Sequence, residues 1–313
     1  MNIKQFTLFK LDILKQVLLI STFSLFLVAC SSDNEDQQYQ PSFSGQRAGG
    51  DDVEYVFGVH PLHNPQRLHE VFSPLMTYLS ENIENASFKL EASRNYASYD
   101  KKLYVQKFDF ALPNPFQTVN SIKKGYKVFG KMGDDHNFRG IILVRKDSGI
   151  EKITDLKNKI VSYPAPTALA ATMMPQYYIQ SNGLNVMTDV DNRYVGSQES
   201  SIMNVFLQHS SAGATWPLPW MSLSRERPEL KQQLTVKWQT DPLPNNGLVY
   251  KPSVPVELVE KVSELLFTLH ANEQGKVILE RMELSMFEKA SENTYQTVND
   301  FLEKFSREVR PLD

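Results

Sequence analysis

The chain has 313 residues, of which 41% are hydrophobic and 22% are charged, and 33 Lys and Arg oppose 36 Asp and Glu. This composition is typical of a folded globular protein and too apolar for a disordered chain. The net charge of −3 gives no basic field for nucleic acid, so we expect no nucleic-acid partner. A single cysteine excludes an internal disulfide and a zinc site built from several cysteines.

An export signal is predicted at the N-terminus. Three lysines precede an apolar run over 17–28, and Cys30 follows shortly after it. A basic segment, a short apolar segment and a small residue before the cleavage point are typical of a secretory signal. The Leu-Val-Ala-Cys run over 27–30 resembles the lipobox of bacterial lipoproteins, in which the cysteine is acylated and becomes the first mature residue. The alternative is a buried N-terminal helix with an incidental cysteine.

The lipobox resemblance implies a signal peptide over 1–29 and a lipid-bearing, polar and flexible tether over 30–52. Multiple acyl chains on Cys30 would hold the protein at a membrane almost permanently. The resemblance therefore implies a periplasmic protein with a membrane anchor, and Ser31 after the cysteine favours the outer membrane.

From residue 54 onward, short strand-like runs alternate with helical patterns. The first predicted elements are strands over 55–59, 88–91, 108–112 and 126–130 and helices over 67–82, 100–106 and 116–124. A second unit has predicted strands over 140–144, 159–163, 193–195, 212–215 and 234–239 and helices over 154–157, 167–182 and 199–209. The C-terminal part has predicted helices over 256–270, 274–282 and 294–310. The alternation predicts an α/β protein with a largely parallel sheet.

Several short motifs follow one another along the chain. They are Phe-Gly-Val-His-Pro over 57–61, Phe-Asp-Phe-Ala over 108–111, Ile-Ile-Leu-Val-Arg over 141–145, Pro-Gln-Tyr-Tyr over 175–178 and Pro-Leu-Pro-Asn over 242–245. As an ordered set, they resemble the phosphate-, phosphite- and phosphonate-binding periplasmic proteins of ATP-driven (ABC) importers.

The resemblance covers about residues 54–290 and implies a type II periplasmic-binding-protein clamshell. One lobe is expected over 53–137 together with 241–313, and the other over 138–240. The ligand is expected between the lobes, where open α/β sheets present the carboxyl ends of their strands. Closure around a ligand is the motion that such a hinged pair performs.

In the family, a Ser-Thr-Ser run at a helix N-terminus binds the phosphorus oxygens, with help from unpaired amides. Alignment on the 175–178 motif places Ala168, Leu169 and Ala170 at these positions, so all three hydroxyls are absent. Hydrogen bonds to charged groups are worth about 1.5–3 kcal/mol each, so the loss amounts to about 4–9 kcal/mol. Thr167 supplies one hydroxyl if the register slips by one residue.

The resemblance marks three further positions in the predicted cleft. Tyr96 retains a tyrosine of the family, Phe138 replaces another, and Gln198 replaces a histidine. Tyr96 is expected either to contact the ligand or to pack between the lobes. Trp216 follows a predicted strand at 212–215 and has the same two interpretations, ligand stacking or core packing.

Three polar residues complete the candidate ligand contacts. Arg139 is suited to a bidentate clamp on a carboxylate or phosphate, with a surface ion pair as the alternative. Asn114 lies between two prolines, either as an amide donor at the cleft edge or as a turn residue. Glu199 either contacts the ligand or complements a helix dipole.

The resemblance implies a solute-binding protein that captures a small ligand, anionic in the family, and passes it to an ABC permease. The alternative is a ligand sensor that signals to a membrane sensor kinase or chemoreceptor. No nucleophile elbow or Gly-rich phosphate loop is found, so we expect neither an enzyme nor a cofactor. His60, His63 and His69 are separated by prolines and do not share a helical face, so no metal site is expected.

Overall fold

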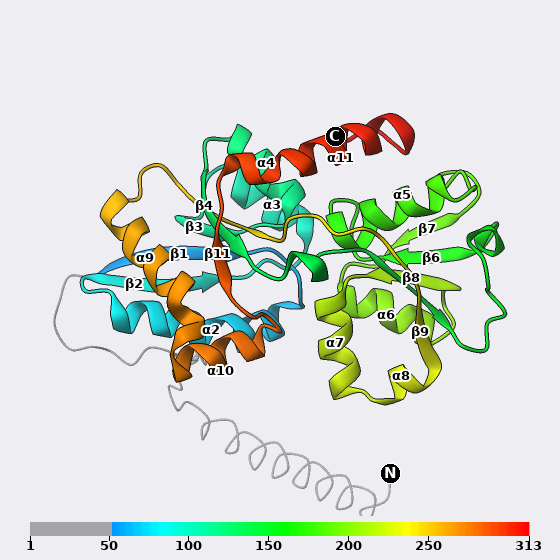
Figure 1. Ribbon diagram of the computed structural model, residues 1–313, viewed down its shortest axis with the longest axis horizontal. Helices are drawn as coiled ribbons and strands as arrows, with labels where there is room; N and C mark the ends of the chain where they lie inside the picture. Colours follow the sequence, from blue (N-terminus) through cyan, green and yellow to red (C-terminus); the bar gives the residue numbers. More distant parts are fainter. Residues whose placement is uncertain (1–51, 313) are drawn as a thin grey trace, which may run out of the picture. The chain divides into compact units, whose positions relative to one another are not determined.

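Two β-sheets organise residues 52–312, the part of the chain that the computed structural model describes. The first sheet has six strands in the order β11-β4-β10-β3-β1-β2, and the second has five in the order β7-β6-β8-β5-β9. Helices lie on both faces of each sheet, so each sheet with its helices forms an α/β lobe (Figure 1). The predicted signal peptide, Cys30 and the tether up to residue 51 lie outside the described residues.

The first lobe is built from both ends of the described chain. Its N-terminal elements are β1 (Val53–Val59), α2 (Pro65–Asn82), β2 (Ala86–Glu91), α3 (Tyr96–Tyr104), β3 (Phe110–Leu112), α4 (Pro115–Lys123) and β4 (Lys127–Met132). Its C-terminal elements are β10 (Gly247–Tyr250), α9 (Val256–Thr268), α10 (Glu273–Arg281), β11 (Phe287–Lys289) and α11 (Gln296–Glu308).

The second lobe is built from the middle of the chain. Its elements are β5 (Ile141–Arg145), β6 (Ile160–Tyr163), α5 (Met174–Ser181), β7 (Asp191–Tyr194), α6 (Gln198–Phe206), β8 (Ala212–Thr215), α7 (Pro217–Glu226), α8 (Glu229–Gln233) and β9 (Leu234–Gln239). A π-helical turn, Leu169–Met173, leads directly into α5. No helix within residues 52–312 is both long and apolar enough to cross a bilayer.

The sheets are mixed, and the prediction of a largely parallel sheet was wrong. Four of the nine strand pairings are parallel and five are antiparallel. Two of the five antiparallel pairings come from a single strand that returns between the lobes. β10 returns from the second lobe and inserts between β3 and β4, antiparallel to both. Local alternation of strands and helices carries no information about such a return.

Side-chain caps set the starts of the helices that border the interlobe face. The Asn64 side chain accepts a hydrogen bond from the Arg67 amide at the start of α2, with Pro65 in the first turn. At the start of α4, Asn114 and Gln117 form a reciprocal capping box. These caps fix where the side chains preceding each helix lie.

One helix begins earlier than predicted and another was not predicted, both for local reasons. The helix expected over 100–106 begins at Tyr96, because Asn95 caps it by accepting a hydrogen bond from the Ser98 amide. α7 was not predicted, because Pro217 and Pro219 resemble helix breakers. Prolines are tolerated in a first turn, where the amides have no intrahelical partner.

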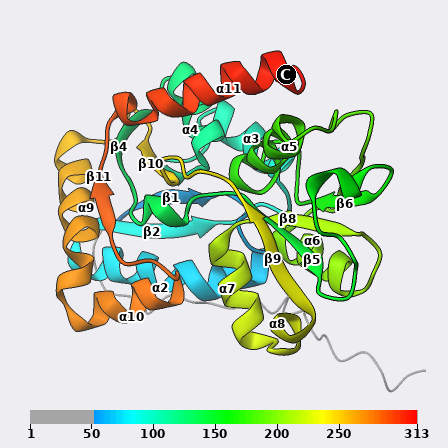
Figure 2. The same cartoon turned by 45° about the vertical axis from the view of Figure 1, so that its right-hand side comes forward.

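Two segments, 133–140 and 240–246, cross between the lobes (Figures 1 and 2). They are hydrogen-bonded to each other, with the Leu243 amide donating to the Phe138 carbonyl at 3.0 Å. The Asn245 side chain also donates to the Gly133 carbonyl at 2.7 Å. The Tyr295 hydroxyl donates to the Asn245 carbonyl at 2.8 Å, which ties the pair to the first lobe.

Candidate functional site

The two lobes meet through apolar side chains. The largest hydrophobic cluster contains Tyr96 from the first lobe and Phe138, Leu169 and Trp216 from the second-lobe side. Each of these side chains is buried, with at most 3% of its surface exposed. The structure therefore brings candidate residues that are far apart in sequence onto one buried interlobe face.

The positions expected to bind an oxyanion lie within this apolar face. Ala168, Leu169 and Ala170 are 2%, 1% and 4% exposed, and Ala168 precedes the π-helical turn without any side-chain cap. The crossing segment packs closely against this turn, since a Cβ on Gly140 would lie 2.7 Å from the Ala170 carbonyl oxygen. The start of this helix therefore provides packing surface and no hydroxyl group at the three positions.

A chain of hydrogen bonds connects the lobes across this face. The Gln198 amide nitrogen donates to the Tyr96 hydroxyl at 3.2 Å, and the Thr215 hydroxyl donates to the Gln198 amide oxygen at 2.8 Å. Burial raises the pKa of Tyr96 well above its usual range, so this phenol stays neutral. The link consists of neutral groups alone.

Aromatic rings surround the link. The rings of Phe138 and Trp216 have centroids 5.4 Å apart with planes tilted by 59°. On the first lobe, the ring of His60 lies 6.2 Å from that of Tyr96 in an edge-on arrangement. Burial lowers the pKa of His60 to about 4, and its Nδ1 lies 2.9 Å from the Leu112 carbonyl oxygen. His60 is therefore a neutral donor to the backbone at neutral pH.

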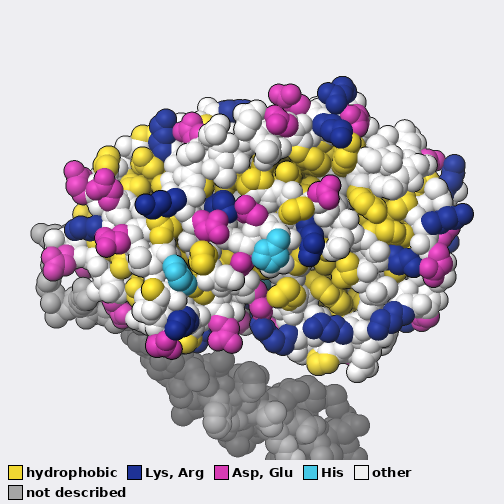
Figure 3. Space-filling model, viewed as in Figure 1, with side chains coloured by type: hydrophobic (Ala, Val, Ile, Leu, Met, Phe, Trp, Pro, Cys, Tyr) yellow, Lys and Arg dark blue, Asp and Glu magenta, His cyan; other side chains and the backbone are white. Residues whose placement is uncertain are grey.

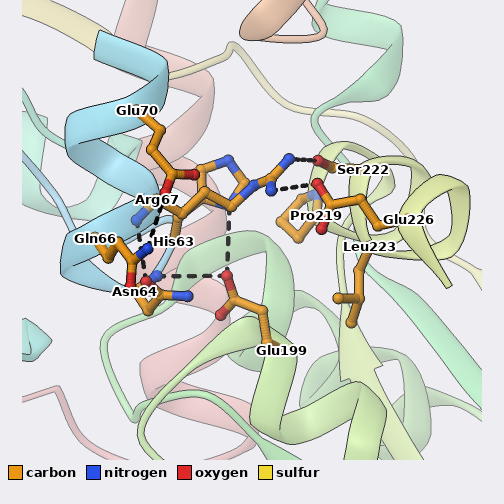
Figure 4. Close-up of a pocket in the computed structure, with 10 residues that line it drawn as sticks. All are labelled: His63, Asn64, Gln66, Arg67, Glu70, Glu199, Pro219, Ser222, Leu223 and Glu226. Carbon is orange, nitrogen blue, oxygen red and sulfur yellow. Dashed lines mark hydrogen bonds and ion pairs between the residues drawn. The ribbon is translucent and has the colours of Figure 1, made fainter. Parts of the chain in front are cut away.

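At one edge of the interlobe face, which we call the first mouth, a cavity of about 200 Å³ opens between the lobes (Figure 4). Ten residues line this cavity: His63, Asn64, Gln66, Arg67, Glu70, Glu199, Pro219, Ser222, Leu223 and Glu226. From the first lobe, Arg67 reaches across to the Ser222 hydroxyl and the Glu226 carboxylate.

Glu199 contacts the first lobe in the same mouth. Its Oε1 lies 3.5 Å from His63 Nδ1 and accepts a hydrogen bond from the Asn64 amide at 3.4 Å. Burial acts to raise the pKa of this carboxyl, but the contact with His63 and the hydrogen bonds outweigh burial and lower it. Its Oε2 is buried and has no hydrogen-bond partner.

At a second mouth, a cavity of about 310 Å³ is lined by residues that include Asp100, Phe116 and Thr167. The Asn114 amide nitrogen donates to the Thr167 carbonyl at 3.1 Å, which links the lobes. Asp100 accepts hydrogen bonds from Gln117 at 2.6 Å and from the Thr167 hydroxyl at 3.5 Å. Burial raises the pKa of Asp100 to about 6, although both hydrogen bonds oppose the shift.

Arg139 is the candidate that the structure does not join to the others. It lies in the crossing segment, and its Nε is buried without a hydrogen-bond partner. No salt bridge connects Arg139 to another residue among 52–312, so the alternative of a surface ion pair was wrong. Asn114 caps α4, and its amide nitrogen donates to the Thr167 carbonyl across the interface. Its role as a ligand contact stays a prediction.

Sequence analysis missed four residues of the interlobe region: His60, His63, Arg67 and Asp100. The histidines were considered only as metal ligands, and residues 52–312 contain no group of three or more His, Cys, Asp or Glu that could hold a metal ion. The position of these residues relative to the helix starts was the signal in the sequence that could have identified them. His63 and Arg67 flank the capped start of a helix, and Asp100 lies one helical turn after Tyr96.

The geometry defines a class of protein, the two-lobed α/β binding proteins in which the chain crosses twice between lobes. The family model described as "ABC transporter, phosphonate, periplasmic substrate-binding protein" matches residues 57–295. The chain therefore belongs to this family of periplasmic substrate-binding proteins. Members of the family bind substrates for ABC transporters and are not enzymes.

Individual relatives are distant in sequence and close in fold. The phosphonates-binding periplasmic protein of Escherichia coli K12 is 19% identical over 247 residues, which are 75% of this chain and 72% of the relative. A solved binding-protein component of an ABC phosphonate transporter from Pseudomonas aeruginosa has a TM-score of 0.75 and 18% identity, covering 82% of this chain and 88% of that one. A Prochlorococcus marinus protein solved with methylphosphonate has a TM-score of 0.75 and 17% identity, covering 81% and 98%.

Proposed function

We propose that this protein captures a small molecule between its two lobes and delivers it to an ABC permease. The observation that carries the proposal is the interlobe face, on which Tyr96 of one lobe and Gln198 of the other are joined by a hydrogen bond. A binding protein needs residues of both lobes to converge on one place, because closure then depends on what lies between them.

The proposed moving parts are one lobe over 53–137 together with 241–313 and another over 138–240. Two observations support this division. Each sheet is formed by strands from only one of the two proposed lobes, and two hydrogen-bonded segments cross between the sheets. Rotation about these segments would separate Tyr96 from Gln198 and expose the apolar face to solvent. A ligand that fills this face in the open form would compensate for the lost contacts.

We propose that Tyr96, Phe138, Gln198 and Trp216 line the ligand, with the helix start at 168–170 closing one side. Apolar and aromatic walls with a few oriented polar groups are usual for sites that enclose a small ligand. Asn114, Thr167 and Glu199 would close the two mouths around the ligand. Arg139 would contact the ligand from the crossing segment.

The lipobox and the polar run after it support a further proposal, that the folded part stands on a tether anchored at Cys30 in the periplasm, with Ser31 favouring the outer membrane. Mass spectrometry of the full-length protein expressed in a bacterium tests this directly. We expect the first mature residue to be an acylated Cys30, and Cys30→Ala to release the protein from membranes. An unmodified Cys30 would refute the anchor and leave the binding function untouched.

Native mass spectrometry of the full-length protein, followed by isothermal titration of any released compound, tests the binding function. We expect a bound small molecule at one copy per chain, and weaker binding by Trp216→Leu. Trp220 lies four residues further along α7 and is half-buried in a separate hydrophobic cluster, so Trp220→Leu is the matched control. A protein that retains no compound and binds none from a broad panel of solutes would contradict the proposal.

A sensory role is the second candidate. The apolar triad Ala168–Leu169–Ala170 supports it, because this departure from the oxyanion positions of the family favours a changed ligand and allows a changed partner. Co-purification with a membrane sensor kinase or chemoreceptor, in a ligand-dependent manner, would favour sensing over import.

A further inference from the structure

One helix joins the two lobes in addition to the crossing segments. α11 contacts α4 of the first lobe and α5 of the second, and in both ribbon views it extends from one to the other (Figures 1 and 2). Its Val298, Leu302 and Phe305 side chains are buried in the largest hydrophobic cluster. Just before the helix, the Tyr295 hydroxyl holds the Asn245 carbonyl of a crossing segment. The start of α11 is therefore fixed to the first lobe beside the crossing segments.

The second lobe contacts α11 through the Pro-Gln-Tyr-Tyr motif over 175–178. The ring of Tyr177 lies 5.7 Å from that of Phe301 in an edge-on arrangement. The Lys304 ammonium nitrogen lies 4.8 Å from the centroid of the Tyr177 ring, where an aromatic face attracts a cation. Val309 packs against the hydrophobic core of the second lobe. The motif therefore has a role between the lobes that its position in the sequence does not indicate.

Arg310 fastens the far end of this segment to the second lobe. Its Nη2 donates to the Pro166 carbonyl at 2.7 Å, and its Nε donates to the Gln176 amide oxygen at 3.4 Å. Side chains of both charges gather over this end of α11 (Figure 3). Pro166 directly precedes residues 167–170, the stretch that contains the positions expected to bind an oxyanion. A residue that follows a first-lobe helix thus holds the backbone that leads into the candidate binding helix.

The contacts of α11 with the second lobe are weaker than its contacts with the first. Tyr177, Phe301 and Arg310 are each half-buried, whereas the side chains that hold α11 to the first lobe are buried. Less apolar surface returns to water when half-buried contacts separate, so they cost less to break. When the lobes rotate about the crossing segments, α11 is therefore expected to stay with the first lobe and to release α5.

We propose that α11 and Arg310 form a strap that holds the lobes closed, in which Arg310 releases the Pro166 carbonyl when the lobes separate and binds it again when they close. The inference rests on the proposed binding function and makes Arg310 a positioning residue for the start of the candidate binding helix. In the ligand-free protein, the strap shifts the population toward the closed form. This shift reduces the free energy that a ligand must supply to close the lobes.

Hydrogen–deuterium exchange of the full-length protein in detergent, with no ligand added, tests the strap. The informative peptides cover 60–67 and 196–201, because they contain the first-mouth contact between the Asn64 amide and Glu199, which lobe separation breaks. Arg310→Gln should accelerate exchange in these peptides by about three- to thirtyfold. The expected range is that of one hydrogen bond from a charged donor, reduced because Arg310 is half-buried.

The matched control is Arg307→Gln, the same chemical change three residues earlier. Arg307 is 68% exposed and pairs with Glu308 of its own helix, so exchange should remain as in the parent protein. Arg310→Lys keeps a charged donor near the Pro166 carbonyl and should restore much of the protection at the first mouth. Tyr177→Leu removes the ring contacts with Phe301 and Lys304, and it should act in the same direction as Arg310→Gln.

Faster exchange confined to 166–177 and 296–310 would make Arg310 a local contact and overturn the strap. Unchanged exchange at the first mouth, or an equal acceleration by Arg307→Gln, would overturn it as well. If Arg310→Gln does not fold, Tyr177→Leu decides the question by the same readout. None of these outcomes bears on ligand capture, which native mass spectrometry judges separately, and a protein that binds no solute would contradict the proposed function alone.

Discussion

The raised pKa of Asp100 allows us to calculate how much this residue changes the free energy of unfolding. Burial raises its pKa to about 6 from an ordinary value of 3.8, which is a shift of about two units. Each unit corresponds to about 1.4 kcal/mol. The mouth is partly open to water, which screens the effect, so we expect ionised Asp100 to cost about 1–3 kcal/mol of unfolding free energy above pH 6.

The sign follows from proton binding. Between pH 3.8 and about 6 the folded state holds a proton that the unfolded state has released, so the stability contribution falls as pH rises through this window. Asp100→Asn removes the titration and keeps an acceptor for the amide of Gln117. We therefore expect the variant to be about 1–3 kcal/mol more stable than the parent at pH 7.5 and nearly equal to it at pH 4.

Urea unfolding of both proteins at pH 4, 5, 6 and 7.5 measures this difference. Asp300→Asn is the matched control, because Asp300 is exposed on α11 and its change should not produce the same pH dependence. If Asp100→Asn is as stable as the parent, or less stable, at pH 7.5, the argument from burial is refuted.

Two further predictions concern buried polar contacts and close packing. Gln198→Leu leaves the hydroxyls of Tyr96 and Thr215 buried without this partner, at about 1–3 kcal/mol each, so the urea midpoint should fall by the equivalent of about 2–6 kcal/mol. An unchanged midpoint would show that water replaces the amide. Gly275→Ala would place a Cβ against the Leu269 carbonyl oxygen, which is backbone and cannot turn away. We expect a loss of about 1–3 kcal/mol in thermal unfolding, and a variant as stable as the parent would contradict the packing argument.

Much of the fold follows from local patterns. The strand at 212–215 was predicted with its observed bounds. The helix at 256–270 was predicted from its apolar stripe, and α9 ends two residues earlier, followed by a 3₁₀ turn. β10 and β11 were missed because they are short and lie in the part of the chain that returns to the first sheet.

Candidate residues could be named from the sequence, but the contacts between them could not. A residue type at a family position, such as Tyr96 or Gln198, is visible in the chain, but a hydrogen bond between positions 102 residues apart is not. The pairing of His63 with Glu199 escaped prediction for the same reason. Such contacts depend on how the two lobes face each other.

The sequence by itself determined the alternation of strands and helices, the family motifs, the absence of hydroxyls at 168–170 and the position of the cysteine after a predicted export signal. These are local properties, set by side-chain chemistry and by spacing along the chain. Only the tertiary structure decided that the returning strand makes the first sheet mixed, that Tyr96 meets Gln198, and that Glu199 and Asp100 line the two mouths of the interlobe face. The physical reason is that burial and charge act through space, so their effect on a side chain depends on neighbours that the order of residues does not specify.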